Sequence, residues 1–193
     1  MSNRPVQKKL ILETALRQMF EGGYEKAAID SVSCASALQP EQIRKNYPTN
    51  DELRMAAMEY AASVWLASIA EEVQQKSSRH EKLYTLIYRY IAGSESHPAS
   101  LSLYVDLWKR IRDGADETVP WIKIELEKIY FRYARFFQET LCELFAGVQN
   151  AQQLAWIMVV ISDGFHIQSL VRGTQHDFDQ IAQTFCKMLE SLL

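Results

Sequence analysis

The sequence is poor in the residues that make turns, with only seven glycines and five prolines in 193 residues. A sandwich or barrel of short strands needs a turn every ~8 to 12 residues, so this scarcity argues against such a fold. Its three cysteines, Cys34, Cys142 and Cys186, are odd in number and form no C-x-x-C pair. Neither a disulfide framework nor a zinc knuckle is therefore expected.

The chain also lacks an excess of charge of one sign and a long apolar run. Its 21 Lys and Arg residues face 24 Asp and Glu residues, which gives a net charge of -3. DNA-binding domains often have a pI above ~9, so any DNA-binding surface here must be local. The longest apolar run, residues 154–161, is far shorter than the ~20 residues that cross a bilayer. Residues 1–10 lack the apolar core of a signal peptide, so we expect a soluble, cytoplasmic protein without a membrane partner.

A large hydrophobic share is present, and it recurs at helical spacing. Hydrophobic residues make up 48% of the chain, enough to bury a sizeable core. No stretch alternates apolar and polar residues with the period of a strand, so the pattern predicts an all-α fold of about nine helices. The expected helices cover residues 6–20, 29–36, 39 to just before 48, about 25 residues from 49, 81–92, 98–112, 119–146, 151–172 and 177–193.

Several helix ends carry recognisable signals. A Gly-Gly pair at 22–23 closes the first helix, as a C-cap would. Pro40 suits the first position of the third helix, and Gln42 is placed to fold back as a capping partner. Thr49 and Glu52 form a predicted capping box at the start of the long fourth helix.

Three short N-terminal helices, with a tight turn between the second and third, are what a helix-turn-helix DNA reader needs. Residues 11–53 resemble the N-terminal domain of the tetracycline-repressor (TetR) family, above all at Tyr-Pro-Thr (47–49) followed by Asp-Glu-Leu (51–53). The resemblance implies a helix-turn-helix DNA-binding domain over residues 1–48. It also implies a helical effector-binding and dimerisation domain over residues 49–193.

The function implied by the resemblance is that of a ligand-responsive transcription regulator, more often a repressor than an activator. Its partners would be double-stranded operator DNA, a small apolar or aromatic effector, and a second copy bound through the last two helices. A two-fold dimer matches a palindromic operator. The sequence does not indicate the operator, the effector or the regulated genes.

Four positions depart from the family pattern in the DNA-binding head. Ala28 replaces a capping Thr or Ser, and Ala37 replaces the turn glycine, which costs about 1 kcal/mol if the turn is kept. Glu41 places a negative charge near the DNA backbone, and Asn50 replaces a common Lys. Residues 1–53 carry seven basic and seven acidic side chains. The alternative is therefore a TetR-like scaffold with a degenerate head that acts through a protein partner.

A neutral head can still bind DNA if its cations share one face, because affinity depends on the phosphates that are neutralised at the surface. Glutamine can pair with adenine, and arginine can pair with guanine. Ordinary solvated side chains are the simpler interpretation of the same residues. The candidate DNA-binding residues are Arg4, Lys8, Lys9, Lys26, Gln39, Gln42, Arg44 and Lys45.

Aromatic residues are frequent in the larger part of the chain, and aromatic walls with a few polar groups suit a small apolar ligand. Most such residues simply fill a core. The resemblance places an effector pocket among the fourth to eighth helices. The candidate ligand-binding residues are Trp65, Tyr88, Tyr104, Trp108, Phe137 and His166.

Catalytic and metal-binding motifs are not found in the sequence. No nucleophile elbow, P-loop or dinucleotide fingerprint occurs, so we expect no enzyme and no cofactor. Asp163 and His166 lie one helical turn apart but lack a third ligand at suitable spacing, so no metal site is expected there. The remaining histidines, His80, His97 and His176, fall in predicted connections and are expected to be exposed to solvent.

Overall fold

The computed structural model describes residues 4–93, 98–114, 117–172 and 176–192, without the side chains of residues 4, 98–101, 170–172 and 192. Within these ranges the chain forms nine α-helices and one short 3-10 helix, and no strand occurs in them. The prediction of an all-α fold with about nine helices is confirmed. None of the helices in the described ranges combines the length and apolar character needed to cross a membrane.

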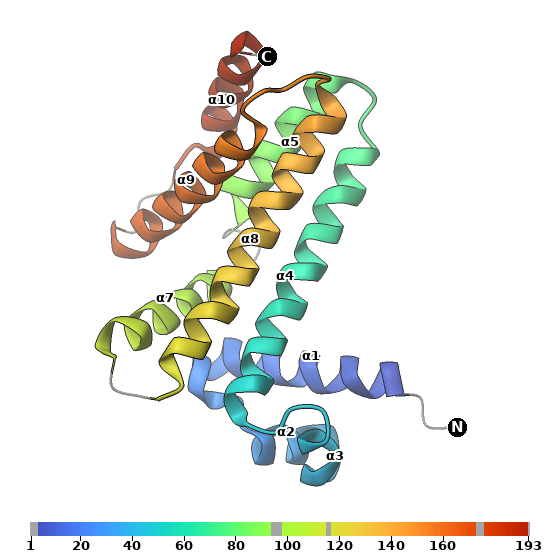
Figure 1. Cartoon of the computed structure of the whole chain (residues 1–193), viewed down its shortest axis with the longest axis vertical. Coiled ribbons are helices and arrows are strands. Elements are labelled where there is room, and N and C mark those ends of the chain that lie inside the picture. The colour runs from blue at the N-terminus through green and yellow to red at the C-terminus, as the bar shows by residue number, and fades with distance from the viewer. Residues whose placement is uncertain (1–3, 94–97, 115–116, 173–175, 193) are drawn as a thin grey trace. The chain divides into compact units, whose positions relative to one another are not determined.

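Most helices follow the bounds that the sequence predicts (Figure 1). They are α1 (Arg4–Gly22), α2 (Ile29–Ser36), α3 (Pro40–Arg44), α4 (Asn50–Gln74), α5 (Arg79–Ile91), α7 (Pro98–Asp113), α8 (Val119–Leu144), α9 (Ala151–Arg172) and α10 (Phe178–Leu192), with the 3-10 helix η1 (Tyr24–Lys26) after α1.

Helix α3 is shorter than predicted, because it ends at Arg44. The amides of Asn46 and Tyr47 both donate to the carbonyl of Ile43, at 2.9 Å each, so the chain tightens into a turn. This turn ends the helix before Pro48, whose ring then disfavours a helical conformation at Tyr47.

The chain divides into two compact units. Unit 1 comprises Met1–Val64 and Ser102–Glu127, and unit 2 comprises Trp65–Leu101 and Lys128–Leu193. Helices α4, α7 and α8 contribute residues to both units, because each continues through a boundary. Unit 1 thus contains α1 to α3, the first part of α4, most of α7 and the start of α8.

The helix-end signals read from the sequence operate in unit 1. Gly23 follows α1 with a φ of 87°, in the region that favours glycine, and its amide donates to the Met19 carbonyl at 2.8 Å. At the start of α4 the Glu52 amide donates to the Thr49 hydroxyl at 3.2 Å, and the Thr49 amide donates to the Glu52 carboxylate at 3.4 Å. The predicted capping box is therefore confirmed.

Unit 2 is built around aromatic side chains. Tyr90 and Phe137 are almost fully buried, and their rings meet edge to face with centroids 5.2 Å apart. Trp65 packs against Tyr90 and, edge to face, against Tyr133. The Tyr90 hydroxyl donates to the Tyr133 carbonyl, so this buried polar group is satisfied.

Candidate DNA-binding surface

The turn between α2 and α3 has the backbone that a helix-turn-helix requires, without the usual glycine. Ala37 has φ 57° and ψ 25°, the left-handed conformation expected from the sequence. It is the one non-glycine residue with positive φ in the described ranges. The Ser33 hydroxyl donates to the Leu38 carbonyl at 2.5 Å, which helps to close the turn. The strained residue is therefore held by a local hydrogen bond.

The start of α2 is capped from another helix. Ala28 has no side-chain oxygen with which to accept from the first amides of α2. The side-chain oxygen of Asn50, the first residue of α4, instead accepts from the Ile29 amide at 2.9 Å. Two departures from the family pattern, Ala28 and Asn50, thus compensate for each other. This hydrogen bond joins the first turns of α2 and α4.

The predicted DNA-binding residues lie on α1 and η1 and on or directly beside α3, all in unit 1. Those whose side chains are described are all exposed, and the Arg44 side chain is 48% exposed. Arg4 begins α1, but its side chain lies outside the described residues. On α3 the pattern is one-sided, because Ile43 is fully buried while its neighbours face solvent. Lys8, Lys26 and Lys45 have no carboxylate within 4.0 Å among the described residues. These three cations are available to phosphates.

Other candidates are engaged within the protein. Arg44 donates to Asp30 at 3.2 Å and lies 3.9 Å from a carboxylate oxygen of Glu41. Lys9 lies 3.7 Å from Glu13, one turn along α1. The Gln39 amide donates to the Gln42 side-chain oxygen at 2.9 Å, so the predicted capping role of Gln42 is confirmed. Reading a base would require Arg44 and Gln42 to change partners.

A buried arginine holds the head to α4, and the sequence did not single it out. The Arg54 side chain is 7% exposed, and its guanidinium donates to the carbonyls of Ala27 and Glu25, at 2.7 Å each. It also pairs with the carboxylates of Asp51 at 3.1 Å and Glu25 at 2.5 Å. Each of the three guanidinium nitrogens thus has a hydrogen-bond partner, as a buried guanidinium requires. The feature of the sequence that could have pointed to Arg54 is its position in α4, next to the Thr49–Glu52 capping box.

The same carboxylates receive a second arginine from α7. Arg110 donates to both oxygens of Asp51 at 3.0 Å and to Glu25 at 2.7 Å. The Tyr24 amide donates to Asp106 of α7 at 3.4 Å. Burial, followed by the Asp51 carboxylate, raises the pKa of Tyr24. Through these contacts α7 joins the base of the helix-turn-helix head within unit 1.

The predicted effector residues are distributed over both units. Tyr104 and Trp108 belong to α7 in unit 1, with ring centroids 6.4 Å apart. Trp65, Tyr88, Phe137 and His166 belong to unit 2. Phe137 is fully buried among its neighbours, and Tyr88 stacks on Tyr84 with centroids 5.9 Å apart. Only part of the predicted set therefore lies in any one unit.

Two polar groups of α9 are placed in an apolar setting in unit 2. Burial raises the pKa of Asp163 to about 6, although the nearby Tyr130 hydroxyl offsets part of the shift. Burial lowers the pKa of His166, and its Nε2 atom is buried without a hydrogen-bond partner in the described part of the chain. His176, expected to be exposed, is half-buried against Phe165 and Phe178. His80 is exposed as expected but lies in α5, and His97 falls outside the described residues.

Helices α9 and α10 expose an apolar surface. On α9, Ile157, Val160 and Ile167 are 50, 66 and 40% exposed, and on α10 Met188 is 53% exposed. Gly164 lies on the same stripe of α9, since it follows Ile157 by two turns, and a Cβ built on it meets no atom within 4 Å. A contiguous apolar stripe on a helix is typical of a surface that binds another protein chain.

Comparison with known proteins identifies the fold. No protein-family model matches the sequence, and no curated protein sequence matches it. A TetR transcription regulator from Haloarcula marismortui ATCC 43049 superposes with a TM-score of 0.69 at 14% identity, over 95% of this chain and 96% of that one.

Two regulators named FadR superpose as well. The fatty acid degradation regulator FadR from Bacillus halodurans has a TM-score of 0.68 at 11% identity, over 95% of this chain and 94% of that one. FadR from Bacillus subtilis, solved with stearoyl-CoA, has a TM-score of 0.66 at 12% identity, over 94% of this chain and 96% of that one. With helix-turn-helix geometry at one end and matches over nearly the whole length, this chain has the fold of the TetR-family transcription regulators.

Proposed function

We propose that this protein is a ligand-responsive DNA-binding transcription regulator of the TetR type, which acts as a repressor released from its operator by a small apolar or aromatic effector. The observation that carries the proposal is the α2–α3 turn. Ala37 keeps the left-handed backbone at an energetic cost of about 1 kcal/mol. A left-handed residue ends many helices, but it is usually glycine, so an alanine that keeps this backbone keeps it against a steric cost. Its retention supports a role for the relative placement of α2 and α3.

The exposed face of the head supplies a means of binding phosphates. Lys8, Lys26 and Lys45 come from three separate elements, α1, η1 and the end of α3. Each phosphate that they neutralise releases a condensed counterion, so affinity should fall steeply with salt. Gln39 lies at the start of α3 and is exposed. Among the described residues no other side chain hydrogen-bonds to its side chain, so it is the candidate that is free to contact a base.

The effector is proposed to bind among the aromatic residues of the domain that follows the head. Stearoyl-CoA, with which the Bacillus subtilis FadR was solved, carries a long apolar chain. The orphan Nε2 atom of His166 offers one polar group to such a ligand. Since α4 begins at the Asn50 cap of α2, a shift of α4 on effector binding would disturb the head directly. The ligand's differential affinity for the two conformations sets the size of this coupling.

The regulator is further proposed to work as a homodimer through α9 and α10. The exposed stripe of Ile157, Val160 and Ile167 supports a helical partner, and Gly164 allows a second backbone to approach closely. A second copy of the chain is the fitting occupant, because a symmetric pair presents two recognition helices to a palindrome. Val160→Asp should convert the dimer to a monomer in analytical ultracentrifugation, whereas Val64→Asp, also at an exposed valine, should not.

The decisive experiment is a fluorescence anisotropy titration of the full chain against DNA that flanks its own gene, over a series of salt concentrations. Lys45→Ala should weaken binding and flatten the salt slope by about one, while Lys123→Ala, an exposed lysine of α8, should do neither. Binding that shows no salt dependence, or no binding at low salt, would contradict the proposal.

A second function is favoured by one observation, the engagement of Arg44 by Asp30 and Glu41. These three side chains form an exposed patch of mixed charge on α2 and α3 that suits a protein partner better than phosphate. The double variant D30N/E41Q separates the two functions. A DNA reader should gain about tenfold in affinity, because Arg44 is released and two repulsive charges are removed. A scaffold that acts through a partner should gain no DNA affinity and should lose the partner in a pull-down.

A further inference from the structure

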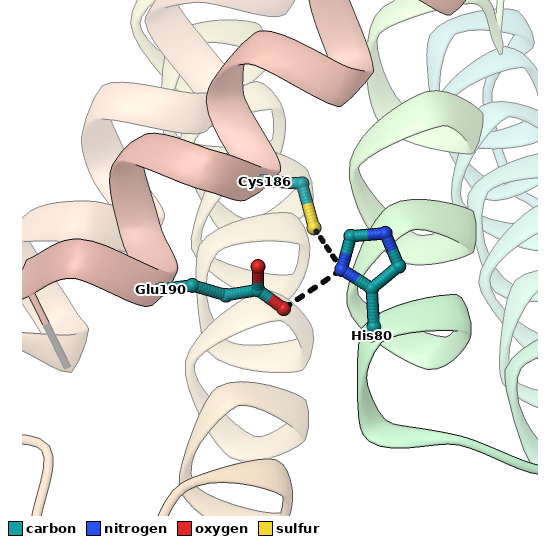
Figure 2. A group of neighbouring side chains, drawn as sticks. All are labelled: His80, Cys186 and Glu190. Carbon is teal, nitrogen blue, oxygen red and sulfur yellow. Dashed lines mark hydrogen bonds and ion pairs between the residues drawn. The ribbon is translucent and has the colours of Figure 1, made fainter.

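We propose that unit 2 contains a zinc-binding site formed by His80 of α5 with Cys186 and Glu190 of α10. No sequence motif indicates a metal here, because His80 lies 106 residues before Cys186. The fold brings them together where α5 packs against α10 (Figure 2). Their ligand atoms all lie within 4.8 Å of one another. The site is independent of the proposed DNA and effector functions.

The geometry of the three side chains fits a tetrahedral cation. Cys186 and Glu190 are four residues apart on α10, so both project from one face of the helix. The Nδ1 atom of His80 lies 3.6 Å from the Cys186 sulfur and 2.9 Å from a carboxylate oxygen of Glu190. With metal distances of ~2.3 Å to sulfur and ~2.0 to 2.2 Å to nitrogen and oxygen, a tetrahedral site has ligands about 3.2 to 3.6 Å apart. Because the ligand atoms lie within 4.8 Å of one another, closing such a site requires the carboxylate to move a few tenths of an ångström from the imidazole and up to about 1 Å toward the sulfur.

The ligand types favour zinc over a hard cation. A thiolate and an imidazole select zinc or cobalt, whereas calcium and magnesium require a shell of oxygens. The Cys186 thiol loses its proton to solvent when the sulfur–metal bond forms, and the metal then carries one thiolate and one carboxylate. The two negative ligands neutralise the divalent charge, which suits a site that is partly buried.

Access and a fourth ligand position are available on the His80 side. Cys186 is fully buried, whereas the side chains of His80 and Glu190 are 58 and 34% exposed. A surface pocket of about 280 Å³ adjoins the site and is lined by His80, Glu81, Tyr84, Gln183 and Lys187. Water from this pocket would complete a four-coordinate shell. With three protein ligands, the site resembles open zinc centres more than closed structural ones.

The competing explanation is that His80 and Glu190 form an ordinary ion pair above a buried thiol. Cobalt distinguishes the two, because Co²⁺ replaces Zn²⁺ with little change in geometry and reports its ligands by absorption. The untagged full chain, treated with a chelator and dialysed, is titrated with Co²⁺. We expect a sulfur-to-cobalt charge-transfer band and intense tetrahedral d–d bands that saturate at one equivalent and disappear when Zn²⁺ is added.

Variants assign the ligands. C186S should abolish the charge-transfer band. H80N or E190Q should weaken Co²⁺ binding at least about tenfold, because even the loss of a residue that only hydrogen-bonds to a metal ligand has an effect of that size. The matched control C34S/C142S removes the two exposed cysteines and should keep the band. If C186S fails to fold by circular dichroism, H80N and E190Q decide, since both alter exposed side chains. The proposal is overturned if no band forms, if the control loses it, or if H80N and E190Q bind Co²⁺ as the parent does.

Discussion

The two units are stabilised by different chemistry. Unit 1 adds to its apolar core a partly buried charge network, in which Arg54 and Arg110 share the carboxylates of Glu25 and Asp51 beneath the head. Unit 2 is centred on packed rings, with Tyr90 and Phe137 buried. Ion pairs are directional and fix one arrangement of their partners, whereas apolar packing depends mainly on volume. The comparison indicates that unit 1 is specified by geometry and unit 2 by packing.

The largest expected effect tests the aromatic packing in the core of unit 2. Phe137→Ala should lower the free energy of unfolding by about 3 to 5 kcal/mol, because it leaves a cavity in the core of unit 2. Urea unfolding measured by tryptophan fluorescence checks this. Phe131→Ala on the same helix is the control, because that ring is 59% exposed and its loss should cost less than about 1 kcal/mol. Similar losses for both variants would mean that packing does not dominate unit 2.

The ion pairs of unit 1 are tested by replacing Arg54. Arg54→Met should cost about 3 kcal/mol, because two backbone carbonyls and the carboxylates of Glu25 and Asp51 lose a buried partner. Arg135→Met removes an exposed pair with Glu139 and should leave the free energy of unfolding nearly unchanged. Equal effects in urea unfolding would show that the network under the head contributes no more than a surface ion pair.

A pH series sharpens the comparison, because unit 2 buries the Asp163 carboxyl group, which is costly to ionise there. The pKa of Asp163 is raised by burial to about 6, so the folded protein retains a proton that the unfolded chain releases near pH 4. Its contribution to stability is therefore full below pH 4, is lost as the pH rises to about 6, and amounts to at most about 3 kcal/mol.

The variant Asp163→Asn should remove that slope from a series of urea unfolding curves. His166, one turn away, contributes with the opposite sign, because burial lowers its pKa and its contribution is lost as the pH falls below 6.5. The difference between parent and variant isolates Asp163. Parallel curves from pH 4 to 6 would mean that this carboxyl is already ionised in the folded protein.

The smallest expected effect concerns the turn in unit 1. Ala37→Gly should raise the free energy of unfolding by about 0.5 to 1 kcal/mol, because glycine adopts the left-handed conformation without steric cost. Ala35→Gly, at an exposed position within α2, should lower it by about 1 kcal/mol. Thermal unfolding distinguishes the two signs. A loss of stability in both variants would argue that Ala37 is unstrained.

Local sequence signals predicted the fold well, because they act between near neighbours. The Thr49–Glu52 capping box, the Gly23 stop and the left-handed Ala37 each depend on a few residues, and each is present in the structure. The prediction for α3 was too long, because a turn through Ile43 precedes Pro48.

Contacts between residues that are far apart along the chain could not be predicted from the sequence. Nothing local indicates that Arg110 contacts Asp51, 59 residues away, or that His80 lies beside Cys186. The candidate DNA-binding residues could be predicted as a surface, but not the pairing of Arg44 with Asp30, since it depends on how α2 packs on α3. The role of Asn50 as a cap for α2 was likewise hidden, because a cap is normally sought in the residue before the helix.

The hydrogen bond from the Ile29 backbone amide to the Asn50 side chain depends on the position of α4, so hydrogen exchange at that amide reports movement of this helix. The Ile29 amide has its acceptor on a different helix, at 2.9 Å, so a displacement of the first turn of α4 by about an ångström would expose it to water. The neighbouring amide of Val32 donates to Ala28 within its own turn and would not respond. The ratio of deuterium uptake at these two amides therefore follows the movement of α4 without a label, and it can be read in the protein alone and after DNA or a candidate effector is added.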